Sequence, residues 1–170
     1  MRDAQEGPIG RSRPLRIGVI GSSGATETEM ALARAVGAAI GRAEAVTVCG
    51  GLGGVMAAAA EGAAREGGIV LGILPGGSDE GAAPGVTIPV PTGMGEGRNV
   101  IVARVAEAVI AIAGEWGTLS EAAFCRKFGT PVIGLRSTLP ERVLTETASE
   151  PAEAVARAVE LAQARRRGLR

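Results

Sequence analysis

The sequence predicts an α/β fold: a three-layer, Rossmann-like parallel sheet with helices on both faces. Three observations predict it. Short apolar runs alternate with helical segments along the chain. The runs lack the apolar–polar alternation of a sheet with one wet face, as expected for strands buried on both sides. Glycine, with 27 residues among 170, gathers in tight turns that follow several of the runs.

Each expected strand is a short run rich in Val, Ile, Leu or Ala and bounded by turn residues. The strands are expected at residues 15–20, 46–49, 69–74, 86–90, 108–113, 131–135 and 143–147. The run at 86–90 lies inside a long connection, residues 75–92, that is rich in Gly, Pro and Asp. Long connections in compact domains are commonly functional or disordered, so this one is a candidate for contact with a ligand.

Each expected helix follows one of these turns. The helices are expected at residues 26–40, 55–65, 97–105, 118–128 and 151–165. Thr26 and Glu29 have the spacing of a capping box, which marks the start of the first helix. Residues 1–13 mix charge, Gly and Pro and are expected to form a flexible tail. Residues 14–167 are then a single Rossmann-like domain that binds a nucleotide or phosphate.

The composition excludes several classes of function. The 18 basic and 18 acidic residues balance, so the chain lacks the positive field that nucleic-acid binding uses. The absence of His removes imidazole-based triads and metal ligands. Cys49 and Cys125 are too few for a disulfide framework or a zinc site and are expected in the core. No apolar stretch approaches membrane-spanning length. We expect a cytoplasmic protein without metal, cofactor, membrane or nucleic-acid partner.

Three unusual loops are expected to share one edge of the sheet, because right-handed crossovers place all strand-to-helix loops there. They are Gly21-Ser22-Ser23-Gly24, Gly50-Gly51-Leu52-Gly53-Gly54 and Gly114-Glu115-Trp116-Gly117-Thr118. Each precedes a helix, whose free amides and positive dipole end attract an anion. One such turn is also ordinary packing, but three on one edge favour a phosphorylated, nucleotide-like ligand. None matches the dinucleotide or Walker patterns, which argues against classical NAD and ATP enzymes.

Two polar residues follow the long connection, and each has two possible roles. Arg98 could fork onto a phosphate or ribose hydroxyls, or it could pair with Glu96 at the surface. Asn99 could hydrogen-bond a sugar or base, or it could cap the helix.

Two further residues belong to the third loop and the helix after it. Glu121 could complete a capping box with Thr118. It could instead be a carboxylate at the mouth of the phosphate loop, holding ribose hydroxyls or stabilising an oxocarbenium-like centre. Trp116 is either a stacking platform for a base or an ordinary lid residue.

The third loop and its helix resemble the signature of the Lonely Guy family, Pro-Gly-Gly-x-Gly-Thr-x-x-Glu. The matching segment is Gly114-Glu115-Trp116-Gly117-Thr118-Leu119-Ser120-Glu121. Members are cytokinin riboside 5′-monophosphate phosphoribohydrolases, long mislabelled as lysine decarboxylases. The resemblance runs from the first strand to about residue 135, and the second glycine loop is also similar. The segment at residues 92–99 most resembles a small bacterial branch of unassigned activity, in a superfamily that also includes the algal molybdenum cofactor carrier protein.

The resemblance implies two alternative functions and a homodimer. Arg98 and Glu121 match the catalytic pair of the family, whereas Ala113, Glu115 and Asn99 replace its Pro, Gly and Lys. In the enzymatic alternative, water cleaves the N-glycosidic bond of a nucleoside 5′-monophosphate, giving free base and ribose 5-phosphate. Lysine decarboxylation is not expected. In the other alternative, the chain is a non-catalytic carrier or sensor of a phosphorylated ligand such as molybdenum cofactor.

The same comparison implies a set of binding residues around the catalytic pair. The 5′-phosphate would bind the amides of Gly117, Thr118 and Leu119. The full set of expected ligand contacts is Gly21, Ser22, Ser23, Gly50, Gly51, Gly53, Gly54, Met94, Asn99, Gly114, Glu115, Trp116, Gly117, Thr118 and Leu119.

Overall fold

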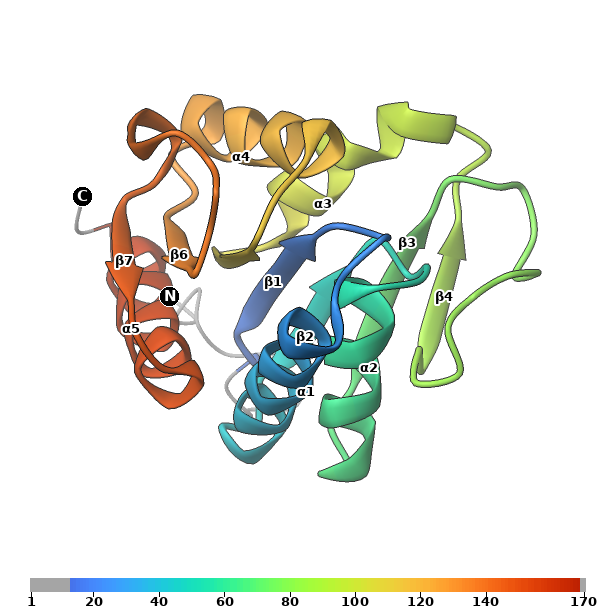
Figure 1. Cartoon of the computed structure of the whole chain (residues 1–170), viewed down its shortest axis with the longest axis horizontal. Coiled ribbons are helices and arrows are strands. Elements are labelled where there is room, and N and C mark those ends of the chain that lie inside the picture. Colours follow the sequence, from blue (N-terminus) through green and yellow to red (C-terminus); the bar gives the residue numbers. More distant parts are fainter. Residues whose placement is uncertain (1–12, 169–170) are drawn as a thin grey trace, which may run out of the picture.

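The computed structural model describes residues 13–168, so the predicted tail at residues 1–13 lies, apart from its last residue, outside the described part. Within that part seven parallel strands form one sheet in the order β4-β3-β2-β1-β5-β6-β7 (Figure 1). The strands are β1 (Arg16–Gly21), β2 (Val46–Cys49), β3 (Val70–Leu74), β4 (Ile88–Pro91), β5 (Ala108–Ile112), β6 (Val132–Leu135) and β7 (Glu146–Ala148).

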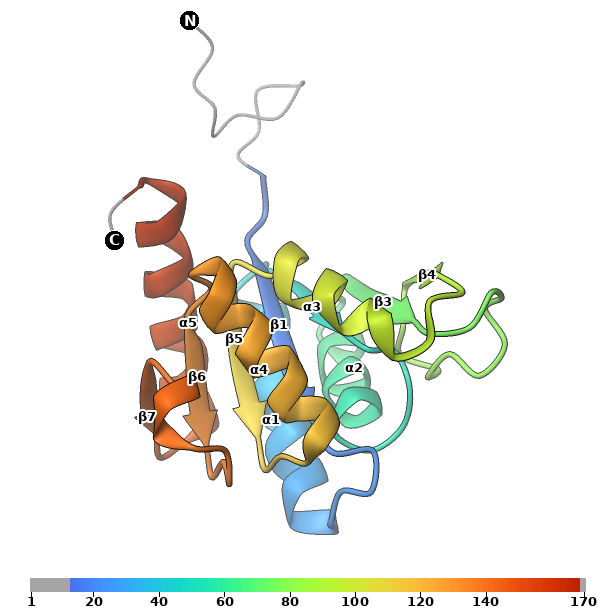
Figure 2. The same ribbon diagram turned by 90° about the horizontal axis from the view of Figure 1, so that it is seen from above.

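Helices cover both faces of the sheet. They are α1 (Glu27–Arg42), α2 (Val55–Arg65), α3 (Asn99–Val105), α4 (Trp116–Phe128) and α5 (Pro151–Arg166), with short 3₁₀ turns η1 (Gly95–Arg98) and η2 (Glu141–Val143). The buried side chains of α1, α2 and α5 form one core cluster with the strands, and those of α3 and α4 form a second on the opposite face (Figures 1 and 2). This arrangement confirms the predicted three-layer Rossmann-like fold.

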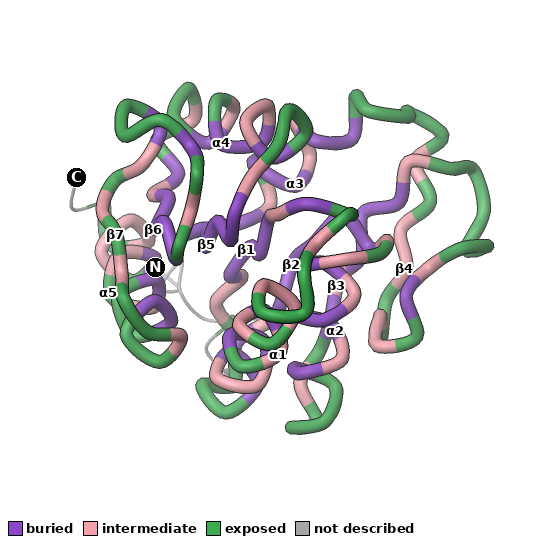
Figure 3. The backbone as a smooth tube through the Cα atoms, in the orientation of Figure 1, coloured by how far each residue is buried: buried purple, intermediate pink, exposed green. Residues whose placement is uncertain are grey.

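The central strands are buried on both faces, which explains why their sequences are continuously apolar (Figure 3). All five residues of β5 are buried. Strand β1 pairs with β2 on one side and with β5 on the other, so the strand order reverses between β1 and β5. In open parallel sheets such a switch point opens a crevice beyond the carboxyl ends of the strands, where ligands bind.

Most element boundaries lie within two or three residues of the expected ones. The capping box of Thr26 and Glu29 is present at the start of α1. Cys49 and Cys125 are both free and buried, as predicted for core residues. One helix differs in a way that matters: α4 begins at Trp116, two residues before the expected start.

Among residues 13–168, no helix combines the length and the apolar character that crossing a membrane requires.

Candidate functional site

A cavity of about 260 Å³ lies at the switch point between β1 and β5. Its walls come from the loop after β1, the loop and first turn after β2, the η1–α3 junction, and the start of α4. The lining residues are Gly21, Ser22, Ser23, Leu52, Met56, Glu96, Arg98, Asn99, Glu115, Gly117, Thr118 and Glu121. Nine of these were expected from the sequence, and Leu52, Met56 and Glu96 were not among the expected contacts.

A buried ion pair lies in the wall of this cavity. Arg98 Nη1 is 3.4 Å from Glu121 Oε1, and the two side chains are only 8 % and 7 % exposed. Arg98 therefore pairs with Glu121 rather than with Glu96, and the interpretation of Arg98 as a surface residue is wrong. Its Nε is buried and has no hydrogen-bond partner within the described chain. The two residues matched to the family's catalytic pair are thus in contact.

The glycine at position 50 makes room for this guanidinium. A Cβ built on Gly50 would lie 2.6 Å from Arg98 Nη2 and 2.6 Å from Met56 Sδ, far inside van der Waals contact. Gly50 is buried and does not line the cavity. The absence of a side chain at Gly50 allows Arg98 to lie against the end of β2. Gly50 therefore contributes to the site indirectly, by making room for Arg98.

Burial dominates the protonation of Glu121. Removal from water raises the pKa of its carboxyl to about 8, because the attraction of Arg98 offsets only part of the desolvation. The nearby Glu96 raises the pKa further. Burial also raises the pKa of the Cys49 thiol to about 11, so this thiol is neutral and poorly nucleophilic. The site therefore offers a carboxyl group that holds its proton at neutral pH.

The early start of α4 changes the interpretation of Glu121 and Thr118. Glu115 is the N-cap residue, and Thr118 lies inside the first turn with 2 % exposure. Of the two alternatives for Glu121, the capping box with Thr118 is therefore absent. Glu121 is instead paired with Arg98, its one side-chain hydrogen-bond partner among residues 13–168.

The first turn of α4 presents free donors. The amides of Trp116, Gly117 and Thr118 have no backbone or side-chain acceptor among the described residues. Leu119 N–H, in contrast, donates to the Glu115 carbonyl at 2.8 Å. The expected anion-binding amides are thus displaced by one residue, and Leu119 does not contribute its amide. Of the free donors, Gly117 and Thr118 line the cavity.

A chain of hydrogen bonds links η1 to this first turn. Arg98 Nη1 donates to Asn99 Oδ1, and Asn99 Nδ2 donates to Ser120 Oγ at 2.9 Å. Ser120 Oγ in turn donates to the Gly117 carbonyl at 2.7 Å. Asn99 is 3 % exposed, so the interpretation of Asn99 as a helix cap is replaced by one in which its amide fixes Arg98 and α4 relative to each other. Sequence reasoning missed Ser120.

Ser22 in the first glycine loop accepts hydrogen bonds from its own loop and from the start of α2. Gly24 N–H donates to Ser22 Oγ at 3.0 Å, and Val55 N–H, at the start of α2, donates to the Ser22 carbonyl at 3.0 Å. The first amide of α2 is therefore not free for an anion. Several expected contacts lie outside the lining of this cavity: Gly50, Gly51, Gly53, Gly54 and Met94.

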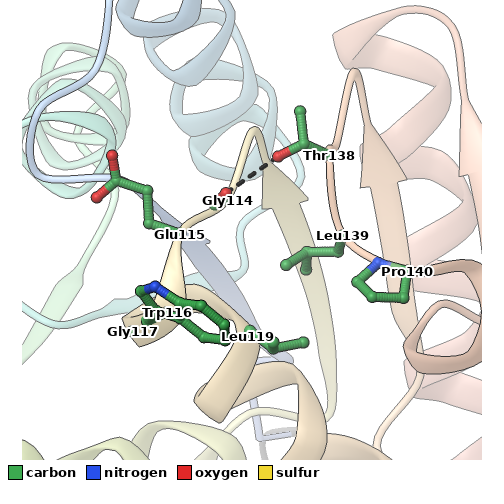
Figure 4. A pocket seen from close by; sticks show the side chains of 8 residues that line it. All are labelled: Gly114, Glu115, Trp116, Gly117, Leu119, Thr138, Leu139 and Pro140. Atoms are coloured by element: carbon green, nitrogen blue, oxygen red, sulfur yellow. Dashed lines mark hydrogen bonds between the residues drawn. The ribbon is translucent and has the colours of Figure 1, made fainter.

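A second cavity, of about 570 Å³, borders the first at the third glycine loop. Its lining holds the remaining expected residues of the third loop, Gly114, Trp116 and Leu119, together with Thr138, Leu139 and Pro140 from the segment after β6 (Figure 4). Glu115 and Gly117 line both cavities. Thr138 Oγ1 donates to the Gly114 carbonyl at 3.0 Å and joins the two walls.

Residues 14–165 match the model of the SLOG cluster4 family. The chain belongs to this family. The match places it in the Lonely Guy-like Rossmann superfamily, which confirms the resemblance noted in the glycine loops.

Relatives of this SLOG cluster4 protein cover 72 % to 88 % of its chain. An uncharacterized protein of Archaeoglobus fulgidus is 40 % identical over 122 residues, which is 72 % of this chain and 80 % of that protein. The molybdenum cofactor binding protein of Rippkaea orientalis is 31 % identical, with a TM-score of 0.82, over 88 % of this chain and 98 % of that one. The molybdenum cofactor carrier protein of Chlamydomonas reinhardtii is 30 % identical, with a TM-score of 0.76, over the same shares.

No three His, Cys, Asp or Glu side chains of this family member gather in a metal-binding arrangement within residues 13–168. Four ionisable side chains line the smaller cavity: the carboxyl groups of Glu96, Glu115 and Glu121 and the guanidinium of Arg98. Chemically, the site can bind an anion through two free amides and one arginine, and it can supply one neutral carboxyl group.

Proposed function

We propose that this protein binds a phosphorylated heterocyclic ligand at the switch point and carries it without chemical change. The ligand class that we favour is a pterin monophosphate of the molybdenum-cofactor type. One observation carries the proposal: the buried Arg98 and the free amides of Gly117 and Thr118 line a single cavity where ligands of open parallel sheets bind.

In this proposal the phosphate lies at the start of α4. Its oxygens accept hydrogen bonds from the Gly117 and Thr118 amides, and the positive end of the helix dipole adds to the attraction. Arg98 supplies the positive charge. Because Glu121 holds its proton near neutral pH, it leaves most of the Arg98 charge available to the phosphate.

Two features favour a carrier over an enzyme. The relatives with solved structures at 30 % and 31 % identity are a molybdenum cofactor carrier protein and a molybdenum cofactor binding protein. In addition, Asn99 replaces the Lys of the hydrolase signature, and both ends of its amide are engaged in the hydrogen-bond chain from Arg98 to Ser120. This position has no free cation for acting on a substrate.

The test compares 6-hydroxymethylpterin monophosphate with its unphosphorylated parent by thermal unfolding. Binding at a hundred times the dissociation constant adds about 2.7 kcal/mol, which raises the Tm by about 5–10 °C. We expect this rise with the phosphorylated compound alone. Arg98→Met should abolish it, whereas Arg126→Met, which removes an exposed arginine at the far end of α4, should not. Equal shifts with both compounds, or none with either, would refute the proposal.

Hydrolysis of a nucleoside 5′-monophosphate is the second candidate, and one observation favours it. Glu121, with its pKa raised to about 8, is a neutral carboxylic acid beside the proposed phosphate position. A buried acid of this kind can protonate the leaving base while the N-glycosidic bond to C1′ of the ribose breaks. Water then bonds to C1′ and gives its proton to the carboxylate left on Glu121, which restores the acid. The products would be free base and ribose 5-phosphate.

The enzymatic alternative is tested with AMP and GMP, by chromatographic assay of free base. Glu121→Gln keeps the shape of the side chain and removes its proton donor, so it should abolish any release. The Arg98→Ala, Glu121→Ala double variant gives the background. Release by the wild type no greater than this background would eliminate the hydrolase and leave the carrier.

A further inference from the structure

The larger cavity has the character of a site for an uncharged ring. Its volume is about 570 Å³, and four of its eight lining residues have apolar side chains: Trp116, Leu119, Leu139 and Pro140. Glu115 is its one charged lining residue, and Figure 4 shows the carboxylate of Glu115 turned away from Trp116 and Leu139. No basic side chain lines it. This cavity therefore offers no cationic side chain to an anion, whereas it offers four apolar side chains to a planar apolar group.

Trp116 is the most exposed large apolar side chain of the described residues. Its exposed fraction is 85 %, although a tryptophan side chain usually buries most of its large apolar surface. It occupies the first position of α4, directly before Gly117 and Thr118, whose amides are free. An indole that faces solvent beside an anion site has the geometry of a stacking platform.

The two cavities share two lining residues, Glu115 and Gly117. A Cβ built on Gly117 would have no atom within 4 Å, so no other residue covers the backbone at this border. The smaller cavity, at about 260 Å³, lies below the usual range of about 300–1,000 Å³ for small-molecule sites. The two together fall within this range.

We propose that the Trp116 cavity is the subsite for the heterocycle of the ligand whose phosphate lies beside Arg98. This inference rests on the proposed function and deepens it, because it fixes the direction of the ligand along the sheet edge. The phosphate lies on the Arg98 side of Gly117. The fused ring lies against the indole, between Trp116 and Leu139. The ligand is therefore a phosphate ester of a planar fused heterocycle. The larger cavity contacts the end of the ligand that lies opposite the phosphate.

The test measures the affinity of two probes by calorimetry: 6-hydroxymethylpterin monophosphate and glycerol 3-phosphate, which has the phosphate but no ring. Trp116→Ala should lower the affinity for the pterin phosphate by about tenfold, the effect typical of losing one aromatic stacking contact. The affinity for glycerol 3-phosphate should change less than twofold. Trp116→Phe should restore most of the loss. Ile88→Ala, at another exposed large apolar residue on β4, is the matched control and should change neither.

Gly117→Leu tests whether the ligand spans the border between the two cavities. The new side chain enters open space, so we expect an unchanged Tm together with a loss of pterin phosphate binding. Equal losses for both probes in Trp116→Ala would refute the ring subsite, because they would show a disturbed phosphate loop. If Trp116→Ala binds the pterin phosphate as tightly as the wild type does, the ring subsite is refuted while the proposed function stands. If neither probe binds the wild type, both the ring subsite and the proposed function are refuted.

Discussion

At the scale of single residues, the site combines one cation with three carboxylates, and only one of these is neutralised. Glu121 is buried against Arg98, and burial keeps its proton near neutral pH. Glu96 and Glu115 are exposed, and both line the cavity that holds the proposed phosphate position. The attraction for an anion therefore depends on Arg98 and the free amides of α4 outweighing two nearby negative charges.

Removing the charge of Glu115 should therefore strengthen binding. We expect Glu115→Gln to raise the affinity for 6-hydroxymethylpterin monophosphate by about two- to fivefold, the scale of a solvent-exposed charge interaction. The gain should shrink at high salt, since screening weakens the repulsion that the substitution removes. Glu150→Gln, which changes an exposed acidic residue at the start of α5, is the control. A lower affinity in Glu115→Gln would mean that this carboxylate binds the ligand.

The sequence identified the residues of the site better than their partners. Arg98, Glu121 and Asn99 were found because they occupy positions of a recognisable signature. Ser120 gave no such signal: a serine on a helix next to a glutamate is typical of a solvated face. Its contact with Asn99 exists only because α3 and α4 pack together on one face of the sheet. Contacts of this kind depend on tertiary packing and leave no local pattern.

At the scale of elements, local patterns predicted every strand and helix but misplaced the start of α4. The spacing of Thr118 and Glu121 satisfies the capping rule, yet the helix begins at Trp116. The rule failed because Arg98, from a distant segment, offered Glu121 a stronger partner than its own helix terminus. The strands were predictable because their signal, an apolar run bounded by Gly or Pro, is wholly local.

The contact between α1 and α2 leads to a prediction about elements. A Cβ at Gly37 in α1 would lie 2.0 Å from the Ala59 carbonyl oxygen in α2, so the helices can approach this closely only over glycine. Gly37→Ala should push them apart and lower the free energy of unfolding by about 1–3 kcal/mol, as overpacking of a core does. Chemical denaturation measures the change. Gly77→Ala, where a Cβ meets nothing within 4 Å, should have little effect, and equal effects would contradict the packing explanation.

At the scale of the whole molecule, hydrogen bonds from the last helix hold the beginning of the described chain against the sheet. Arg166, near the end of α5, donates to the Arg13 carbonyl at 2.6 Å and to the Pro14 carbonyl at 3.1 Å. It also contacts both carboxylate oxygens of Glu107, just before β5. Glu107 accepts in addition from the Arg16 amide at the start of β1. One carboxylate thus joins α5 to the amino ends of two central strands, on the edge opposite the ligand site.

Arg166→Ala should therefore destabilise the whole fold. The side chains of Arg166 and Glu107 are only 20 % and 13 % exposed, so we expect a loss of about 1.5 kcal/mol, or a Tm lower by about 3–6 °C. Arg167→Ala removes the same charge from an exposed neighbour and should lower the Tm much less.

The effect of Arg166→Ala should also depend on pH. Burial raises the pKa of Glu107, but the hydrogen bonds and charges of Arg166 and Arg16 outweigh burial and bring it below the ordinary 4.5. A depressed folded-state pKa contributes stability above pH 4.5, and this contribution is lost as the pH falls through the folded-state value. The Tm difference between wild type and Arg166→Ala should therefore be full at pH 7 and shrink toward pH 3. A difference that stays constant over this range would show that Arg166 stabilises the fold through its carbonyl contacts and not through Glu107.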